Sequence, residues 1–96
     1  MKDYEAIFIL KPDTDENLAK AISIINSVIT KHNGKVIKEE NWGKKPIAYA
    51  IKKEKEGFYY KVNFASEPAY IKDIESAYKL NTAVLRVMII KRESQQ

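Results

Sequence analysis

Cysteine is absent from this chain of 96 residues, and histidine occurs only once, as His32. Without cysteine the chain can form neither disulfide bonds nor thiolate metal sites, and a single histidine cannot build a histidine cluster. His32 lies near the end of a predicted helix, where a charged imidazole would interact favourably with the helix dipole. We therefore assign it no chemistry and expect neither a metal nor a cofactor.

Glycine and proline are also scarce, with three residues of each, and no hydrophobic run is long. A content of 45% hydrophobic and 31% charged residues is typical of a globular domain rather than of a disordered segment. The length suffices for one core but not for two. The apolar run at residues 6–10 is shorter than the hydrophobic segment of a signal peptide and far shorter than a membrane span. We expect a single cytoplasmic domain with no membrane partner.

The excess of positive charge is small, because 17 Lys and Arg residues oppose 13 Asp and Glu residues. A surplus of this size can favour an anionic partner, but salt screens it and many soluble domains carry as much. Charge alone therefore does not decide whether the chain binds nucleic acid.

Hydrophobic periodicity in the first third of the chain predicts a strand followed by a helix. Residues 4–10 alternate but are apolar on both faces, which is typical of a central strand. Asp13, followed three residues later by Glu16, resembles a capping box that starts a helix. Apolar residues then recur at three- and four-residue spacing as far as Asn33-Gly34, a typical helix stop.

The middle of the chain predicts two strands joined by a hairpin. Residues 35–53 have strand character that Gly43 and Pro46 interrupt. Because proline cannot donate to a strand ladder, this strand should lie at a sheet edge or carry a bulge. A charged hairpin loop over residues 52–57 should lead into a strand over residues 58–64.

The last third predicts a second helix and a fourth strand. Ser66 as the N-cap and Pro68 near the first helical position mark the helix start. Residues 84–90 have the pattern of a strand, and residues 92–96 form a polar tail.

The resulting order, β-α-β-β-α-β, is the split βαβ arrangement within one α+β domain at residues 1–91. Right-handed crossovers would place the first and third strands at the centre of a four-stranded antiparallel sheet, with both helices on one face. The other face would be uncovered and yet partly apolar, and such a patch usually marks a partner site. The residues expected on it are Ile7, Ile9, Tyr49, Tyr59, Met88 and Ile90.

The middle of the chain closely resembles the family signature of bacterial small-subunit ribosomal protein six, at residues 42–53 (WGKKPIAYAIKK) and 56–60 (EGFYY). The opening at residues 1–5 (MKDYE) and the closing strand at residues 84–91 (VLRVMIIK) are also similar to those of this family. The resemblance therefore covers nearly the whole chain.

Two residues depart from the family pattern: Pro46, where a polar or charged residue is usual, and Ala50, where many members have proline. The resemblance implies a ferredoxin-like fold and a non-enzymatic protein with no small-molecule substrate. It also implies binding to the central domain of small-subunit ribosomal RNA, jointly with ribosomal protein eighteen.

Basic side chains are the candidates for RNA contact, because Lys and Arg neutralise phosphates and release counterions. A single surface lysine is more often a solvated charge that protects a sheet edge, but the resemblance favours RNA contact for the set. The set is Lys2, Lys44, Lys45, Lys52, Lys53, Arg86, Lys91 and Arg92. The candidates for contact with ribosomal protein eighteen are Ile7, Ile9, Ile47, Tyr49, Ile51, Tyr59, Met88 and Ile90.

Three features leave two interpretations open. Arg86 could pair with a phosphate or a partner carboxylate, or within the chain with Glu5. Trp42 could anchor a partner or cover the end of the core, and we expect the latter. The aromatic run at residues 57–64 faintly resembles the base-stacking strand of RNA-recognition motifs, but Glu56 and Tyr59 break that pattern, so we expect core residues.

Two other functions suit the same architecture. An acylphosphatase-like enzyme would need a glycine-rich loop after the first strand, but residues 11–14 contain no glycine, and no paired nucleophile and base is present. A regulatory domain that binds a small metabolite between protomers would use the uncovered apolar face equally well. Such a sensor should form a homodimer that its ligand stabilises, whereas a ribosomal protein should be monomeric alone and co-purify with small subunits.

Overall fold

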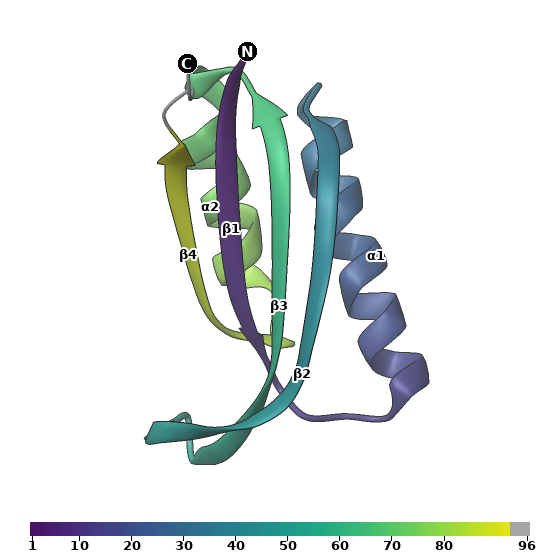
Figure 1. Ribbon diagram of the computed structural model, residues 1–96, viewed down its shortest axis with the longest axis vertical. Helices are drawn as coiled ribbons and strands as arrows, with labels where there is room; N and C mark the ends of the chain where they lie inside the picture. Colours follow the sequence, from purple (N-terminus) through teal and green to yellow (C-terminus); the bar gives the residue numbers. More distant parts are fainter. Residues whose placement is uncertain (93–96) are drawn as a thin grey trace.

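The computed structural model describes residues 1–92 and contains one four-stranded antiparallel sheet and two α-helices (Figure 1). Along the chain lie β1 (Lys2–Leu10), α1 (Asp15–Lys31), β2 (Lys35–Ile51), β3 (Glu54–Ser66), a short 3-10 helix η1 (Pro68–Tyr70), α2 (Ile71–Leu80) and β4 (Val84–Arg92). Arg92, which we assigned to the tail, belongs to β4, and the rest of the predicted tail lies outside the described residues.

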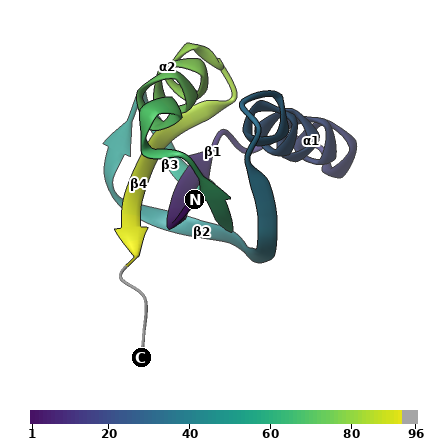
Figure 2. The same ribbon diagram turned by 90° about the horizontal axis from the view of Figure 1, so that it is seen from above.

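The strand order is β2-β3-β1-β4, so the first and third strands are central, as the sequence predicts. Both helices cover one face of the sheet, and the opposite face is open (Figure 2). The split βαβ fold is therefore confirmed. The core between sheet and helices includes Tyr4, Ala6, Phe8 and Leu10 of β1, Tyr60, Val62 and Phe64 of β3, Ile25 and Ile29 of α1, and Ile74 and Tyr78 of α2.

Alternation along the central strands explains why they bury one face. From Tyr4 to Leu10 the even-numbered residues of β1, such as Phe8, are buried, whereas Ile7 and Ile9 are only partly covered. Phe8 lies edge-on against Tyr78, with ring centroids 4.8 Å apart, and the Tyr78 hydroxyl donates a hydrogen bond of 2.9 Å to the carbonyl of Ile25. Helices and sheet are thus joined by apolar contact, and the satisfied buried hydroxyl of Tyr78 links α2 to α1.

The predicted N-caps of both helices are wrong. The side chain of Thr14, not of Asp13, accepts a 3.2 Å hydrogen bond from the Asn17 amide, while Asp13 binds the Thr14 amide and the Asn17 side chain. Ser66 is buried at the end of β3 and does not cap a helix, because η1 starts at Pro68 and precedes α2. The predicted stop is confirmed, since Asn33 has a left-handed φ of 63°.

The β2–β3 hairpin is longer and tighter than expected. Its turn is only Lys52-Lys53, with φ values of 50° and 70°, and Glu54 already belongs to β3. The predicted six-residue loop is therefore wrong. Pro46 lies on an edge strand next to a register shift, as expected, because residues 47–50 of β2 face a single residue of β3. The far end of this hairpin, residues 44–57, bends away from the sheet and is called the hairpin arm below (Figure 1).

Candidate functional site

Strand register gathers a group of apolar side chains on the open face. Ile7 of β1 lies between Lys61 of β3 and Met88 of β4, and Ile9 lies between Tyr59 and Arg86. Five predicted partner-binding residues therefore lie on adjacent positions of three strands: Ile7, Ile9, Tyr59, Met88 and Ile90. We call these five the apolar patch. Met88 is 47% exposed and Ile90 41% exposed, which is high for such side chains.

The hairpin arm extends this patch at one end. A side chain at Gly57 would overlap Ile9 Cγ2 and would lie 3.2 Å from Ile47 Cδ1, so Ile9 and Ile47 both pack over Gly57. Ile47 is thereby joined to the patch. The other two arm candidates lie further out, where Ile51 pairs with Glu54 at the turn and Tyr49 is 86% exposed.

A network of ion pairs lies on the same face next to the patch, because Lys61 is the register partner of Ile7 and Glu5 is that of Ile90. Lys61 Nζ lies 3.0 Å from Glu5 Oε1 and 3.6 Å from Glu40 Oε2, and Arg92 Nη1 lies 3.7 Å from Glu5. The side chains of Lys61 and Glu5 are less than one-fifth exposed. The hydrogen bond to Glu5 raises the pKa of Lys61 above its ordinary value, so this lysine is firmly charged.

Trp42 belongs to this network and not to the core, which corrects our prediction. Its indole N–H donates a 3.3 Å hydrogen bond to Glu40, and the ammonium groups of Lys45 and Lys61 each lie 5.9 Å from its ring. The indole hydrogen bond is the main reason why the pKa of Glu40 lies below its ordinary value. The cause is a register shift between Asn41 and Gly43, which makes Trp42 the extra residue of a bulge.

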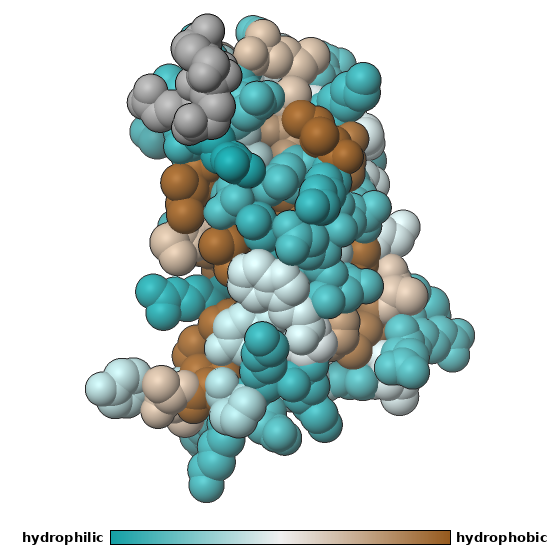
Figure 3. Space-filling view, in the orientation of Figure 1, coloured by the Kyte–Doolittle hydropathy of each residue, from teal (hydrophilic) through white to brown (hydrophobic). Residues whose placement is uncertain are grey.

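This network is not among the features predicted from the sequence, although a signal was present. Glu5 and Lys61 have the same parity as Ile7 and Tyr59, so alternation alone places them on the open face. Seen from that face, the surface shows separate hydrophobic areas among hydrophilic side chains (Figure 3). The open face is therefore an apolar patch beside a charged network, not a continuous apolar sheet.

The eight basic candidates fall into two groups at opposite ends of the sheet. Near the free end of β4 the register places Lys91 and Arg92 opposite the first residues of β1, where Lys2 also lies. The second group lies on or beside the hairpin arm and consists of Lys44, Lys45, Lys52, Lys53 and Arg86. Lys52 and Arg86 line one pocket, whereas Lys44 lines another with Asp13 and Asp15, so the arm lysines do not all lie together. The free end of β4 and the hairpin arm lie at opposite ends of the sheet, which separates the two groups (Figure 1).

The intramolecular alternative for Arg86 is wrong. Glu5 pairs in register with Ile90, which lies four residues beyond Arg86 along β4. The Glu5 carboxylate instead forms ion pairs with Lys61 and Arg92. Within residues 1–92 no ion pair involves Arg86. Its guanidinium is therefore available to an external anion.

Phe58, Tyr60 and Phe64 of β3 belong to the core, as predicted, whereas Tyr59 belongs to the apolar patch. Tyr60 is fully buried, and its hydroxyl donates a 2.7 Å hydrogen bond to Glu39 of β2. Phe58 packs against the same core. These rings cannot stack on bases while the fold is intact.

Neither a metal cluster nor a membrane-spanning helix occurs in the part of the chain that the structure describes. Residues 1–92 contain no group of three His, Cys, Asp or Glu side chains that could hold a metal ion. Over the same residues, neither α-helix has the length and apolar character needed to cross a bilayer.

Comparison with known proteins gives consistent matches. The family model described as "Ribosomal protein S6" matches residues 3–91. Small ribosomal subunit protein bS6 of Helicobacter acinonychis is 41% identical over 97 residues, covering 100% of this chain and 68% of that protein. The bS6 protein of Heliobacterium modesticaldum is 31% identical, covering 99% and 100%.

The crystal structure of 30S ribosomal protein S6 from Thermotoga maritima superposes with a TM-score of 0.88 at 27% sequence identity. The match covers 95% of this chain and 87% of that one. Sequence and fold comparisons therefore agree over nearly the full length.

Proposed function

Because this chain belongs to the ribosomal protein S6 family, we propose that it binds small-subunit ribosomal RNA jointly with ribosomal protein eighteen. The family is structural and not enzymatic, and its members are small-subunit ribosomal proteins located on ribosomes in the cytoplasm. The proposal concerns the finer question of which RNA and which protein are bound, and by which surfaces.

One observation carries the proposal: the hairpin arm joins a basic group of side chains to an apolar patch. Lys44 and Lys45 lie on the same strand segment as Ile47, and Ile47 shares its packing over Gly57 with Ile9 of the patch. A protein seated on the patch would therefore lie beside the basic arm. RNA that contacts the arm could then contact both proteins at once.

The apolar patch is the proposed contact for ribosomal protein eighteen. Partly exposed Met88 and Ile90 would bury apolar area on binding, at roughly 25 cal/mol per Å². The adjoining network of Glu5, Glu40 and Lys61 offers charged groups whose geometry is already fixed, which favours orientation more than affinity.

The basic arm is the proposed contact for the central domain of the RNA. Lysines on a two-residue turn with flanking strands form a protruding, positively charged feature suited to phosphates. Within residues 1–92, Tyr60 and Phe58 of β3 pack in the core and cannot stack on bases, whereas the 40% exposed Trp42 ring already lies near the Lys45 and Lys61 ammonium groups. Recognition would therefore rest mainly on phosphates and RNA shape, and less on individual bases.

Charge reversal tests the RNA surface. The variant with Lys44→Glu, Lys45→Glu and Arg86→Glu should assemble poorly with RNA and ribosomal protein eighteen, while its Tm stays near that of the wild type, because all three side chains are exposed. The matched control reverses Lys20, Lys31 and Lys72, which lie exposed on the helices and change the net charge equally. Equal assembly by the two variants would refute this surface.

A single substitution tests the protein surface. Met88→Glu places a charge within the apolar patch and should weaken binding of ribosomal protein eighteen in the absence of RNA. Leu80→Glu is the control, because Leu80 is 83% exposed on α2 and lies outside the patch. If both variants bind ribosomal protein eighteen like the wild type, the patch is not the contact.

A further inference from the structure

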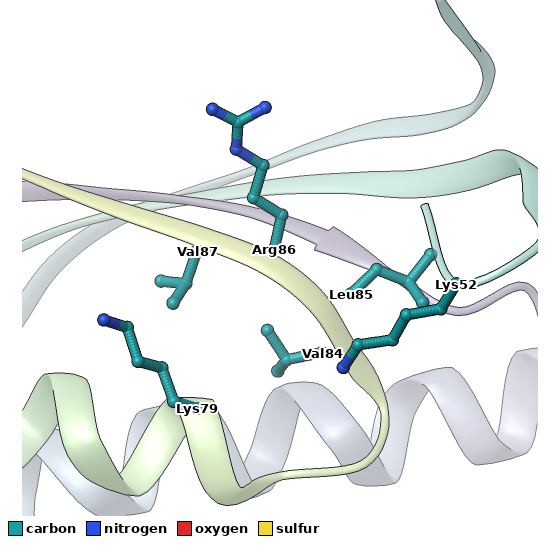
Figure 4. Close-up of a pocket in the computed structure, with 6 residues that line it drawn as sticks. All are labelled: Lys52, Lys79, Val84, Leu85, Arg86 and Val87. Atoms are coloured by element: carbon teal, nitrogen blue, oxygen red, sulfur yellow. The ribbon is translucent and has the colours of Figure 1, made fainter. Parts of the chain in front are cut away.

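A pocket of about 230 Å³ opens along the beginning of β4 (Figure 4). Three elements contribute to it: the β2–β3 turn, the last turn of α2, and β4. Every charged side chain that lines it is positive. Its lining is Lys52, Lys79, Val84, Leu85, Arg86 and Val87.

The two lysines approach the same apolar floor from opposite sides. In Figure 4 the ammonium ends of Lys52 and Lys79 lie on either side of Val84 and Val87. Arg86 extends from the same strand toward the other side of the sheet. Lys52 is held in place by a tight turn, since its φ of 50° belongs to the two-residue link between β2 and β3.

Little within the described residues competes for these charges. Lys79 Nζ lies 3.9 Å from Glu75, in a pair whose side chains are 65% and 40% exposed, and such exposed pairs contribute little. No ion pair involves Lys52 or Arg86 in residues 1–92. Because Lys52 and Lys79 are both positive and no acidic side chain in the described part of the chain lines the cavity, the arrangement suits an anionic ligand.

We propose that this pocket binds one phosphodiester of RNA, with the phosphate between Lys52 and Lys79, the sugar against Val84 and Val87, and an adjacent phosphate at Arg86. The proposal rests on the RNA-binding function proposed above and adds Lys79, which is not among the basic residues predicted from the sequence to contact RNA. It extends the basic arm into a track that crosses the start of β4.

An acidic protein segment is the competing occupant, and the lining favours RNA. The side chains of the pocket present hydrogen-bond donors and no acceptor. A phosphodiester brings acceptors and one negative charge at each nucleotide, whereas a peptide brings an N–H donor with almost every residue. A lysine ammonium is also a common ligand of phosphates.

Removing the charge of Lys79 tests the site. The salt dependence of binding to central-domain RNA, measured with ribosomal protein eighteen present, should become shallower by about 0.7 to 0.9 in the slope of log K against log salt for Lys79→Gln. Lys79→Arg keeps the charge and should retain the wild-type slope. Lys72→Gln, an exposed lysine of the same helix that does not line the pocket, is the matched control.

The outcomes separate this inference from the proposed function. A wild-type slope for Lys79→Gln, together with weak binding by the Lys44, Lys45 and Arg86 reversal variant, would overturn the pocket and leave RNA binding intact. Weaker binding of Lys79→Gln to ribosomal protein eighteen without RNA would assign the pocket to a protein partner and would also overturn the inference. A shallower salt dependence of RNA binding in Lys79→Gln, with the wild-type slope in Lys79→Arg and Lys72→Gln, would support the inference.

Discussion

Gly57 is the residue whose substitution tests the packing between the hairpin arm and the open face. An alanine Cβ there would overlap Ile9 Cγ2 and would lie 3.2 Å from Ile47 Cδ1 and 3.4 Å from the Leu10 carbonyl oxygen. Overpacking of this kind typically costs about 1–3 kcal/mol. Alanine also restricts the unfolded chain, which offsets roughly 0.4–1 kcal/mol.

The expected net destabilisation of Gly57→Ala is therefore about 1–2 kcal/mol. For a domain of this size such a change lowers Tm by roughly 4–16 °C, which thermal unfolding followed by circular dichroism can measure. Binding of ribosomal protein eighteen should weaken as well, because Ile9 must move out of the apolar patch to make room.

The overlapping atom suggests a paired test of this mechanism. Ile9→Ala removes Cγ2 and should restore part of the stability of Gly57→Ala, giving a favourable coupling of about 0.5–3 kcal/mol in a double-mutant cycle. Ile9→Val keeps a Cγ2 methyl group on Cβ and should not rescue. Equal effects of the two substitutions in the Gly57→Ala background, or a Gly57→Ala protein as stable as the wild type, would refute the packing described.

Three further predictions concern the fold and its electrostatics. Ile25→Ala should lower the free energy of unfolding by about 2–5 kcal/mol, because Ile25 is fully buried, whereas Ile24→Ala next to it should change it by less than about 0.5 kcal/mol in urea titrations, since Ile24 is 52% exposed. Burial raises the pKa of the Tyr78 phenol above its ordinary value of 10.0, so its contribution to stability is complete below pH 10 and declines as the pH rises further; Tyr78→Phe should cost about 1 kcal/mol at neutral pH and show a shallower alkaline decline. The hydrogen bond from Trp42 lowers the pKa of Glu40 below 4.5, so the contribution of the Glu40 carboxylate to stability is present above that pH and is lost as the pH falls through the lowered pKa. The Tm of Glu40→Gln should therefore fall less steeply in acid than the wild-type Tm, and an equally steep fall would contradict this.

The sequence predicts the fold well because burial and alternation coincide on the central strands. Tyr4, Phe8 and Leu10 face the core on β1, and Tyr60 and Phe64 do so on β3. Once β-α-β-β-α-β is established, crossover handedness leaves few topologies, and the observed order β2-β3-β1-β4 follows.

Local boundaries are less predictable, because several residues suit the same role. Asp13 and Thr14 are both good N-caps, and only the backbone geometry selects Thr14. The turn at Lys52-Lys53 gives two lysines a positive φ, which glycine or asparagine normally adopts, so the sequence indicates a looser loop.

The candidate surfaces depend on register and could be predicted only in part. The apolar patch follows from parity along β1, β3 and β4, and its predicted residues lie on neighbouring strands. Trp42 changes face because of a bulge, and Lys79 reaches β4 only through the placement of α2. The tertiary contacts that bring Lys52, Lys79 and Arg86 together have no local sequence signal.

The most direct test of joint binding is the affinity of the purified chain for the central domain of small-subunit ribosomal RNA, measured with and without ribosomal protein eighteen across a salt series. Joint recognition predicts salt-sensitive binding that requires ribosomal protein eighteen or is strengthened by it. Absence of binding in both conditions would contradict the account and would favour a regulatory domain that binds a small metabolite.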